Sequence, residues 1–300
     1  MNYSFKRSSE VYIVKDGLGY GVSALSNFTL SQTLSEKTLN RRNLFKRIAP
    51  KQVINRTKNV GTGSLEIYYT KNCPTLALLL ESLDFEYEYN RLFRFKNIFS
   101  NIPKSLGLVV IDTVTGHAIN IKDVYVTNMD VQCSPTNISK ITFGFSFTES
   151  YEGASLAYLN KPVIPEYPKP EYIDFRLLNQ QINSVKSAAF TITRSLRWLS
   201  DGATQFNLGK IASSAAPVVT EYNITSLVTA NDNLDKATFT NLTPFNTDVI
   251  VGNNSFFLAL PNAKVTTRKE PAEVFTINFD IKHQSLSTVL LGGTYNGYIN

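Results

Sequence analysis

The chain has 300 residues, of which 43% are hydrophobic and 18% are charged. This balance supplies enough apolar side chains for one large or two ordinary folded domains, and it excludes an intrinsically disordered protein. The net charge of +6 permits a nucleic-acid partner without requiring one, and no stretch reaches the ~18 apolar residues of a membrane-spanning helix.

The aromatic and cysteine contents narrow the class further. The 19 Phe and 15 Tyr favour pleated surfaces, so we expect a mainly β protein. Only Cys73 and Cys133 are present, which excludes a disulfide framework, and we expect both to be small buried thiols. The opening MNYSFKRSSEVYIVKDG lacks the apolar core of a signal peptide, so a reducing compartment is the simpler expectation.

The first clear elements along the chain are two strands joined by a long basic segment. NFTLSQTL at 27–34 and GSLEIYYT at 63–70 have strand character. The segment between them, NRRNLFKRIAPKQVINRTK at 40–58, is predicted as a loop and has no acidic residue. Its basic residues are Arg41, Arg42, Lys46, Arg47, Lys51, Arg56 and Lys58.

Three interpretations of the basic segment 40–58 stay open. Its charges can neutralise the phosphates of a nucleic acid without reading the base sequence. They can also dock onto an acidic face of another protein, or simply keep the protein soluble. The apolar residues Leu44, Phe45 and Ile48 within the run favour docking.

One helix is predicted next, over residues 74–83. Pro74 suits the first turn, where its missing N–H costs nothing, and four leucines follow at helical spacing. FEYEYNRLFRFKNIF at 85–99 alternates charged and aromatic residues and is expected to return to strand.

The two longest alternating strands resemble each other. ITFGFSFT at 141–148 and FTINFDIK at 275–282 each place apolar residues on one face and small or polar residues on the other. Extended backwards, residues 128–148 and 262–282 align without a gap at an offset of 134 residues. Each segment is typical of a β-hairpin whose loop holds a proline.

A second similarity lies upstream and indicates a duplication. NFTLSQTL at 27–34 resembles AFTITRSL at 189–196, and the two pairs of similar segments occur in the same order. KPVIPEYPKPEY at 161–172 holds four prolines and predicts an extended linker. We therefore expect a first domain at 1–160, the linker at 161–172 and a second domain at 173–300.

The sequence offers little for catalysis. The two histidines, His117 and His283, hold non-equivalent positions in the two halves and are expected on the surface. No spacing places either of them beside a cysteine, and no Walker loop, HExxH or CxxC motif occurs. We expect neither an enzyme nor a protein that holds a metal ion or a cofactor.

The order of these elements resembles the tail tube proteins of long-tailed bacteriophages, in the version with two tube domains in one chain. The resemblance rests on the strand–long segment–strand start, the helix at 74–83, the hairpin at 128–148 and the repeats at 189–196 and 262–282. It implies two tandem domains, each a β-sandwich, with a helix flanking at least the first. The long strands then form a barrel around a channel.

The resemblance also implies an assembly. Three chains close a ring with pseudo-sixfold symmetry, and such rings stack through the long segment. The channel holds the tape measure protein and the genomic DNA without sequence-specific binding. The protein is then a structural part of the virion tail, assembled in the cytoplasm of the bacterial host.

Two sets of residues receive roles from the resemblance. The side chains expected to face the channel are Thr142, Gly144, Ser146, Thr276, Asn278 and Asp280. The side chains expected to dock on an adjacent ring are Arg41, Arg42, Lys46, Arg47, Lys51 and Arg56. Small, polar or acidic channel residues suit the passage of DNA, because lysine or arginine there would bind phosphate.

Other interpretations remain beside this one. The ring belongs either to the main tail tube or to the tail tip, where it joins the shaft to the distal baseplate proteins. A nucleic-acid-binding module would use the basic segment. A carbohydrate- or receptor-binding β-sandwich would use an aromatic platform formed by Tyr68, Tyr69, Tyr87 and Tyr89.

Overall fold

The protein is mainly β, as its composition predicts, with 22 strands and one helix in the part that the structure describes. The computed structural model describes residues 2–4, 9–41, 51–69, 74–87, 92–95, 103–153, 158–161, 169–178, 180–199, 216–231, 243–253, 256–270, 276–283 and 290–292.

The elements of the two halves follow the predicted order. Those of the first half are β1 (Asn2–Ser4), β2 (Ser9–Lys15), β3 (Leu18–Gly21), β4 (Leu25–Ser31), β5 (Leu34–Arg41), β6 (Lys51–Lys58), β7 (Gly61–Tyr68), α1 (Pro74–Ser82), β8 (Phe85–Tyr87), β9 (Leu92–Phe95), β10 (Leu106–Asp112), β11 (Ala118–Ser134), β12 (Asn137–Phe147), β13 (Glu149–Glu152) and β14 (Tyr158–Asn160). Those of the second half are β15 (Ile173–Leu177), β16 (Gln180–Gln181), β17 (Val185–Leu199), β18 (Ala216–Asn231), β19 (Phe245–Asn253), β20 (Phe257–Glu270), β21 (Thr276–His283) and β22 (Leu290–Gly292). The predicted helix and both predicted hairpins are confirmed.

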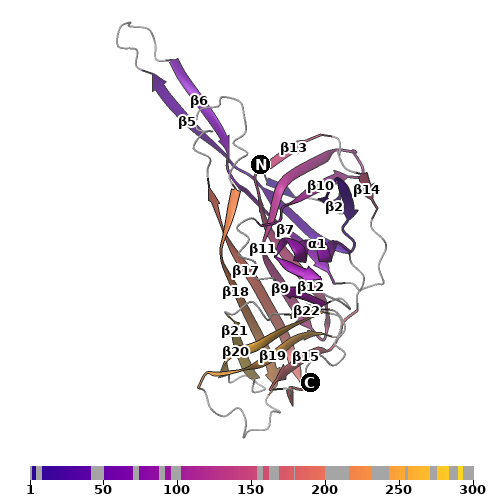
Figure 1. Cartoon of the computed structure of the whole chain (residues 1–300). Helices are drawn as coiled ribbons and strands as arrows, with labels where there is room; N and C mark the ends of the chain where they lie inside the picture. The colour runs from indigo at the N-terminus through magenta and orange to yellow at the C-terminus, as the bar shows by residue number, and fades with distance from the viewer. Residues whose placement is uncertain are drawn as a thin grey trace.

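One long antiparallel sheet runs through both halves (Figure 1). Its strands pair in the order β4, β7, β12, β11, β17, β18, β21 and β20. The joint between the halves is the β11–β17 ladder, in which residues 128–133 lie opposite residues 188–193. The four strands from the first half and the four from the second half therefore form one continuous sheet.

A second, smaller layer of strands accompanies each half of the long sheet. In the first half, β2 pairs with β3 and with β10, and β10 pairs with the start of β11. From Tyr125 onward, β11 pairs with β12 instead. In the second half, β15 pairs with β16 and β19, and β19 pairs with the start of β20, whose later residues pair with β21.

The same six ladders therefore occur in the same order in both halves, which is the arrangement expected of a duplicated unit. One detail of the sequence alignment is wrong. Residues 135–136 separate β11 from β12, whereas residues 271–275 separate β20 from β21. Because more residues separate the two strands of the second hairpin, the gapless offset of 134 residues can match only one strand of each hairpin.

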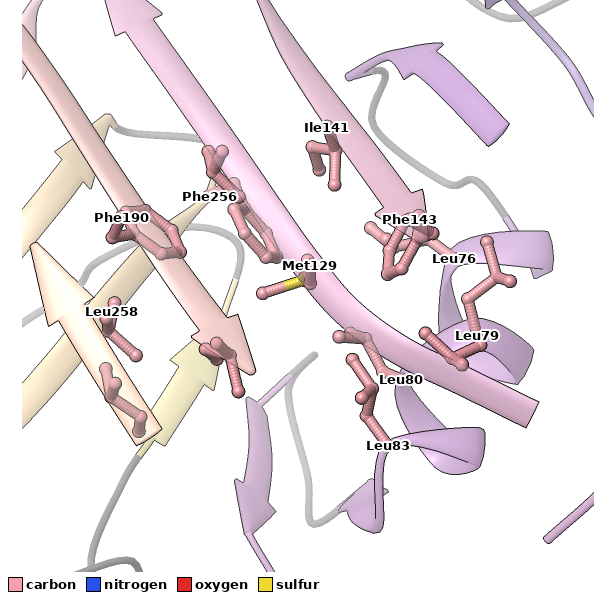
Figure 2. Close-up of a cluster of buried hydrophobic side chains, with 14 of the residues drawn as sticks. Leu76, Leu79, Leu80, Leu83, Met129, Ile141, Phe143, Phe190, Phe256 and Leu258 are labelled. Atoms are coloured by element: carbon pink, nitrogen blue, oxygen red, sulfur yellow. The ribbon is translucent and has the colours of Figure 1, made fainter. Parts of the chain in front are cut away.

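The core lies between the two layers and is shared by both halves. Figure 2 shows the leucines of α1 on one side of Met129 of β11, and Phe190 of β17 with Phe256 on the other. Phe143 of β12 lies near the same helix. The leucines that α1 and the residue after it bury are those of the predicted helical stripe, Leu76, Leu79, Leu80 and Leu83.

The halves are held together by side chains as well as by the β11–β17 ladder. Arg194 of β17 is fully buried and donates from Nη1 to the carbonyl oxygen of Ser82 at 2.7 Å and to Asp84 Oδ2 at 3.3 Å. Ser82 ends α1, so the guanidinium lies at the negative end of the helix dipole. Phe256 of the second half packs against Tyr69 of the first, with ring centroids 5.4 Å apart.

The structure also decides the predictions for single residues. Cys133 is buried as expected, and burial raises the pKa of its thiol to about 11; Cys73 lies outside the described residues. His117 is exposed in the β10–β11 turn, as predicted. The surface prediction for His283 is wrong, because it continues the core-facing alternation of β21 two residues after Ile281 and is only 4% exposed.

Candidate functional site: the polar face of the long sheet

The long sheet has one face toward the core and one face of polar side chains. Residues directly opposite each other on paired strands share a face, so the ladders trace rows across the sheet. One row crosses the whole sheet and is polar at every position: Asn27, Glu66, Thr142, Asp130, Thr191, Thr225, Lys282 and Lys264. Both halves of the chain contribute equally to this row.

A neighbouring row continues the same character with smaller side chains. It runs through Thr29, Ser64, Gly144, Asn128, Thr193 and Asn223. A Cβ atom at Gly144 would lie 1.9 Å from Asn128 Oδ1, so a larger residue there would require the Asn128 side chain to move. The Asn128 amide in turn donates to Asp130 Oδ2 at 2.7 Å, which fixes two polar groups over the sheet surface.

The predicted channel residues all belong to this alternation, but not all of them are accessible. Asp280 is exposed, and Thr142, Gly144 and Asn278 are half-buried on the polar face. Ser146 and Thr276 are buried, at 5% and 7% exposed. The accessible surface of the single chain therefore includes Asp280, Thr142, Gly144 and Asn278. It does not include Ser146 or Thr276.

Sequence reasoning missed the basic residues of this face. It considered the two long strands β12 and β21 alone, whereas the rows also pass through the neighbouring strands, which carry charged residues. The basic residues of the polar face include Lys264 and Lys282 on the first row, and Lys140 and Arg268 on rows parallel to it. The acidic residues of the same face include Glu66 and Asp130 on the first row, and Glu270 and Asp280 on parallel rows. The surface is therefore mixed in charge rather than acidic.

Several of these charges are paired with each other. Lys140 Nζ donates to Glu66 Oε1 at 3.0 Å, and the Ser26 hydroxyl donates to the same oxygen at 2.6 Å. The Ser26 hydrogen bond, followed by the Lys140 contact, lowers the pKa of the Glu66 carboxyl. Lys282 lies 4.0 Å from Asp280 Oδ2. Arg268 and Glu270 form a further ion pair at the edge of the sheet.

The basic segment is not the loop that the sequence predicts. Residues 34–41 and 51–58 form an antiparallel hairpin, β5–β6, which projects away from the body of the molecule (Figure 1). Arg41 lies opposite Lys51 in this ladder, and Arg56 lies opposite Glu36. The predicted docking residues Arg42, Lys46 and Arg47 lie outside the described residues.

The second half extends its sheet at the matching place in the chain. In the second half, β17 and β18 correspond to β4 and β7. Their ladder continues to Leu199 and Ala216. Residues 199–222 of the sequence hold one basic residue, Lys210. The two halves therefore differ in charge at this end of the sheet.

The two edges of the long sheet are the second feature of the site. At one end, residues 266–270 of β20 pair with β21 on one side, and no described strand pairs with their other side. At the other end, the outer side of β4 pairs with the short strand β1, through residues 2–4 opposite 29–31. Such edges are templates for pairing with another chain.

The tyrosines of the carbohydrate interpretation do not form one platform. Tyr68 lies on the polar face, where Lys140 Nζ is 5.3 Å from its ring centroid. Tyr69 packs against the core residue Phe256, and Tyr87 is 56% exposed on the short strand β8. Tyr89 lies outside the described residues.

Other kinds of site receive no support from the described residues. A cavity of about 660 Å³ crosses the β12–β11–β17–β18 surface, and Lys140 is the only charged side chain in its lining. No group of three or more His, Cys, Asp or Glu side chains could hold a metal ion in the part of the chain that the structure describes. Within the same residues, no helix is long and apolar enough to cross a membrane.

Comparisons with known proteins agree with this architecture. The family model described as the Bacteriophage Baseplate Tube Protein Family matches residues 1–291. Baseplate tube protein p140 of Escherichia phage T5 is 23% identical to the chain over 294 residues, which cover 94% of each protein. The chain therefore belongs to the bacteriophage baseplate tube protein family, whose members are structural components of the phage tail.

Proposed function

We propose that three copies of the chain close a ring of the phage tail tube, with the polar face of the long sheet around a central channel for DNA. The observation that carries the proposal is the β11–β17 joint between two halves of the same topology. If the same kind of joint recurs between chains, β20 of one copy pairs antiparallel with β4 of the next.

The edges of the sheet support this closure. Residues 128–133, which pair with β17, lie past the stretch of β11 that pairs with β10. Residues 266–270 likewise lie past the stretch of β20 that pairs with β19. A ring would pair this edge with the next chain and so remove the edges of the sheet.

The polar face supports the channel. Three chains that each contribute the strands β4, β7, β12, β11, β17, β18, β21 and β20 would make a barrel of about twenty-four strands, and barrels of roughly 16–18 strands already leave a water-filled bore. The ion pairs on this face neutralise cations that would otherwise hold phosphate. Thr142, Gly144, Asn278 and Asp280 would then face the DNA.

Cross-linking tests the closure and the number of chains. In a Cys73→Ser background, Thr29→Cys is combined in turn with Thr266→Cys, Arg268→Cys or Glu270→Cys. Thr29 lies on the polar face of β4, and the other three lie on the same face of β20. Upon mild oxidation, we expect one combination to give covalent dimers and trimers on a denaturing gel, with nothing larger.

The controls separate a ring from other arrangements. Thr29→Cys with Thr225→Cys, on the interior strand β18, should give no covalent oligomer. A ladder of bands beyond the trimer would mean an open chain of subunits and would contradict the ring. Absence of cross-links in all three combinations, together with a monomeric mass in solution, would contradict it as well.

The family description favours a position in the baseplate, at the tip of the tube. A tip ring meets different neighbours on its two sides, whereas a shaft ring stacks on copies of itself. Electron microscopy of the concentrated protein separates the two roles. Single rings fit the baseplate position, and long tubes would place the chain in the shaft.

The β5–β6 hairpin is proposed to dock on the adjacent ring. Its length and its projection from the body suit contact with a neighbour, and the basic charge of 40–58 suits an acidic surface. We expect Arg41→Glu, Arg42→Glu and Arg47→Glu together to abolish docking in a co-sedimentation assay while the trimer stays intact. A control with the exposed residues Lys104, Lys122 and Lys169 changed to Glu should dock normally, and docking by the hairpin variant would exclude this role.

A further inference from the structure

The short N-terminal strand β1 occupies a place on β4 that has a counterpart in the second half. Residues 2–4 run antiparallel to residues 29–31 on the side of β4 that faces away from β7. The sequence match between β4 and β17 places 29–31 on 191–193, and these lie opposite residues 128–130 of β11. β1 thus follows the path, with the same direction, that β11 takes along β17.

We infer that β1 is a placeholder for strand β20 of a second copy of this chain, and that it is displaced when the ring closes. This inference rests on the proposed ring. The ladder of β1 spans three residues, whereas the equivalent β11–β17 ladder spans six. Because a longer ladder makes more backbone hydrogen bonds, each of which is net stabilising, the longer strand is expected to replace the shorter one.

The few contacts of β1 make the exchange simple. Among the described ladders β1 pairs with β4 alone, so its release from the sheet edge breaks no other described strand pairing. The opposite edge is protected by a different device, since β20 carries Arg268, Lys269 and Glu270 along its open stretch. Charged residues and a covering strand are two ways in which β proteins prevent unwanted edge pairing. The single chain therefore keeps both edges from pairing until the correct neighbour arrives.

A reversible lock tests the exchange in the full-length protein. Ser4 and Thr29 lie directly opposite each other in the β1–β4 ladder, so Ser4→Cys with Thr29→Cys, in the Cys73→Ser background, can tie β1 to its edge. We expect the oxidised protein to remain monomeric by mass photometry and the reduced protein to form trimers. Ser4→Cys alone is the control and should assemble equally in both states.

A second variant tests the same idea in the opposite direction. Removing residues 1–4 uncovers the edge of β4 and should lower the protein concentration for half-assembly by about tenfold. If the locked protein assembles as well as the reduced one, or if the deletion leaves the half-assembly concentration unchanged, β1 is not a placeholder. That result leaves the ring standing, because the unmodified protein still forms trimers; a protein that stays monomeric in every variant overturns both.

Discussion

Replacing Arg194 with alanine should lower the free energy of unfolding by about 3 kcal/mol, the largest effect expected of any single substitution here. The side chain is fully buried and bonds to the last carbonyl of α1 and to Asp84. Removing one partner of a buried ionic contact typically costs about 3–5 kcal/mol, because the other partner loses its compensation. We use the lower end, since Asp84 retains some contact with water. Chemical denaturation followed by tryptophan fluorescence measures the change.

A neighbouring arginine provides the control for this prediction. Arg197 lies on the same strand and is exposed, so Arg197→Ala should change stability by less than about 0.5 kcal/mol. Arg194→Lys should fall between the two, because an ammonium group keeps the charge but loses the planar fork of donors. Equal effects of the two alanine substitutions would mean that the contact between β17 and α1 does not hold the halves together.

Placing lysines on the polar face should make a disulfide-closed trimer retain linear DNA. The variant combines Thr193→Lys with Asp280→Lys, both exposed on the face proposed to line the channel. Each chain gains three positive charges, and phosphates held by them release counterions. In a gel-shift assay at low salt, we expect at least about tenfold tighter binding to linear duplexes than the unmodified trimer has. For each phosphate that is neutralised, the slope of the logarithm of the binding constant against the logarithm of the salt concentration should become more negative by about 0.9.

The topology of the DNA distinguishes a channel from an ordinary basic surface. A closed ring can thread onto linear DNA but not onto covalently closed circles, so the variant should prefer the linear form. The matched control places the same charge on the second layer through Val114→Lys and Glu152→Lys, which are both exposed. It should bind linear and circular DNA equally. No preference for linear DNA in the polar-face variant would contradict a channel lined by this face.

The long hairpins and the helix could be predicted because their side chains alternate between core and surface. In β12 and β21 every second residue is buried, so the period of two is visible in the letters. The leucines of α1 are visible for the same reason at helical spacing. The β5–β6 hairpin was missed because its segments, LSEKTLNR and KQVINRTK, are largely polar and show no clear apolar alternation.

The role of Arg194 could not be predicted from spacing. The alternation of AFTITRSL places it on the core side together with Phe190 and Ile192, where an apolar residue is expected. Its partners lie about 110 positions away along the chain, at the end of a helix in the other half. The ion pairs of the polar face were missed for a related reason, since Lys140 and Glu66 become neighbours only when β12 pairs with β7.

The charge difference between the two halves has a consequence for how a ring meets its neighbours. In the proposed ring, the basic β5–β6 hairpins alternate with the nearly neutral extensions of β17 and β18. The strand topology of the inner wall then repeats six times per turn, while the pattern of charge at the rim repeats only three times. A neighbour built from three copies of one chain would meet an identical rim surface at each copy. The ring would thus connect a channel of nearly sixfold symmetry to neighbouring proteins of threefold symmetry.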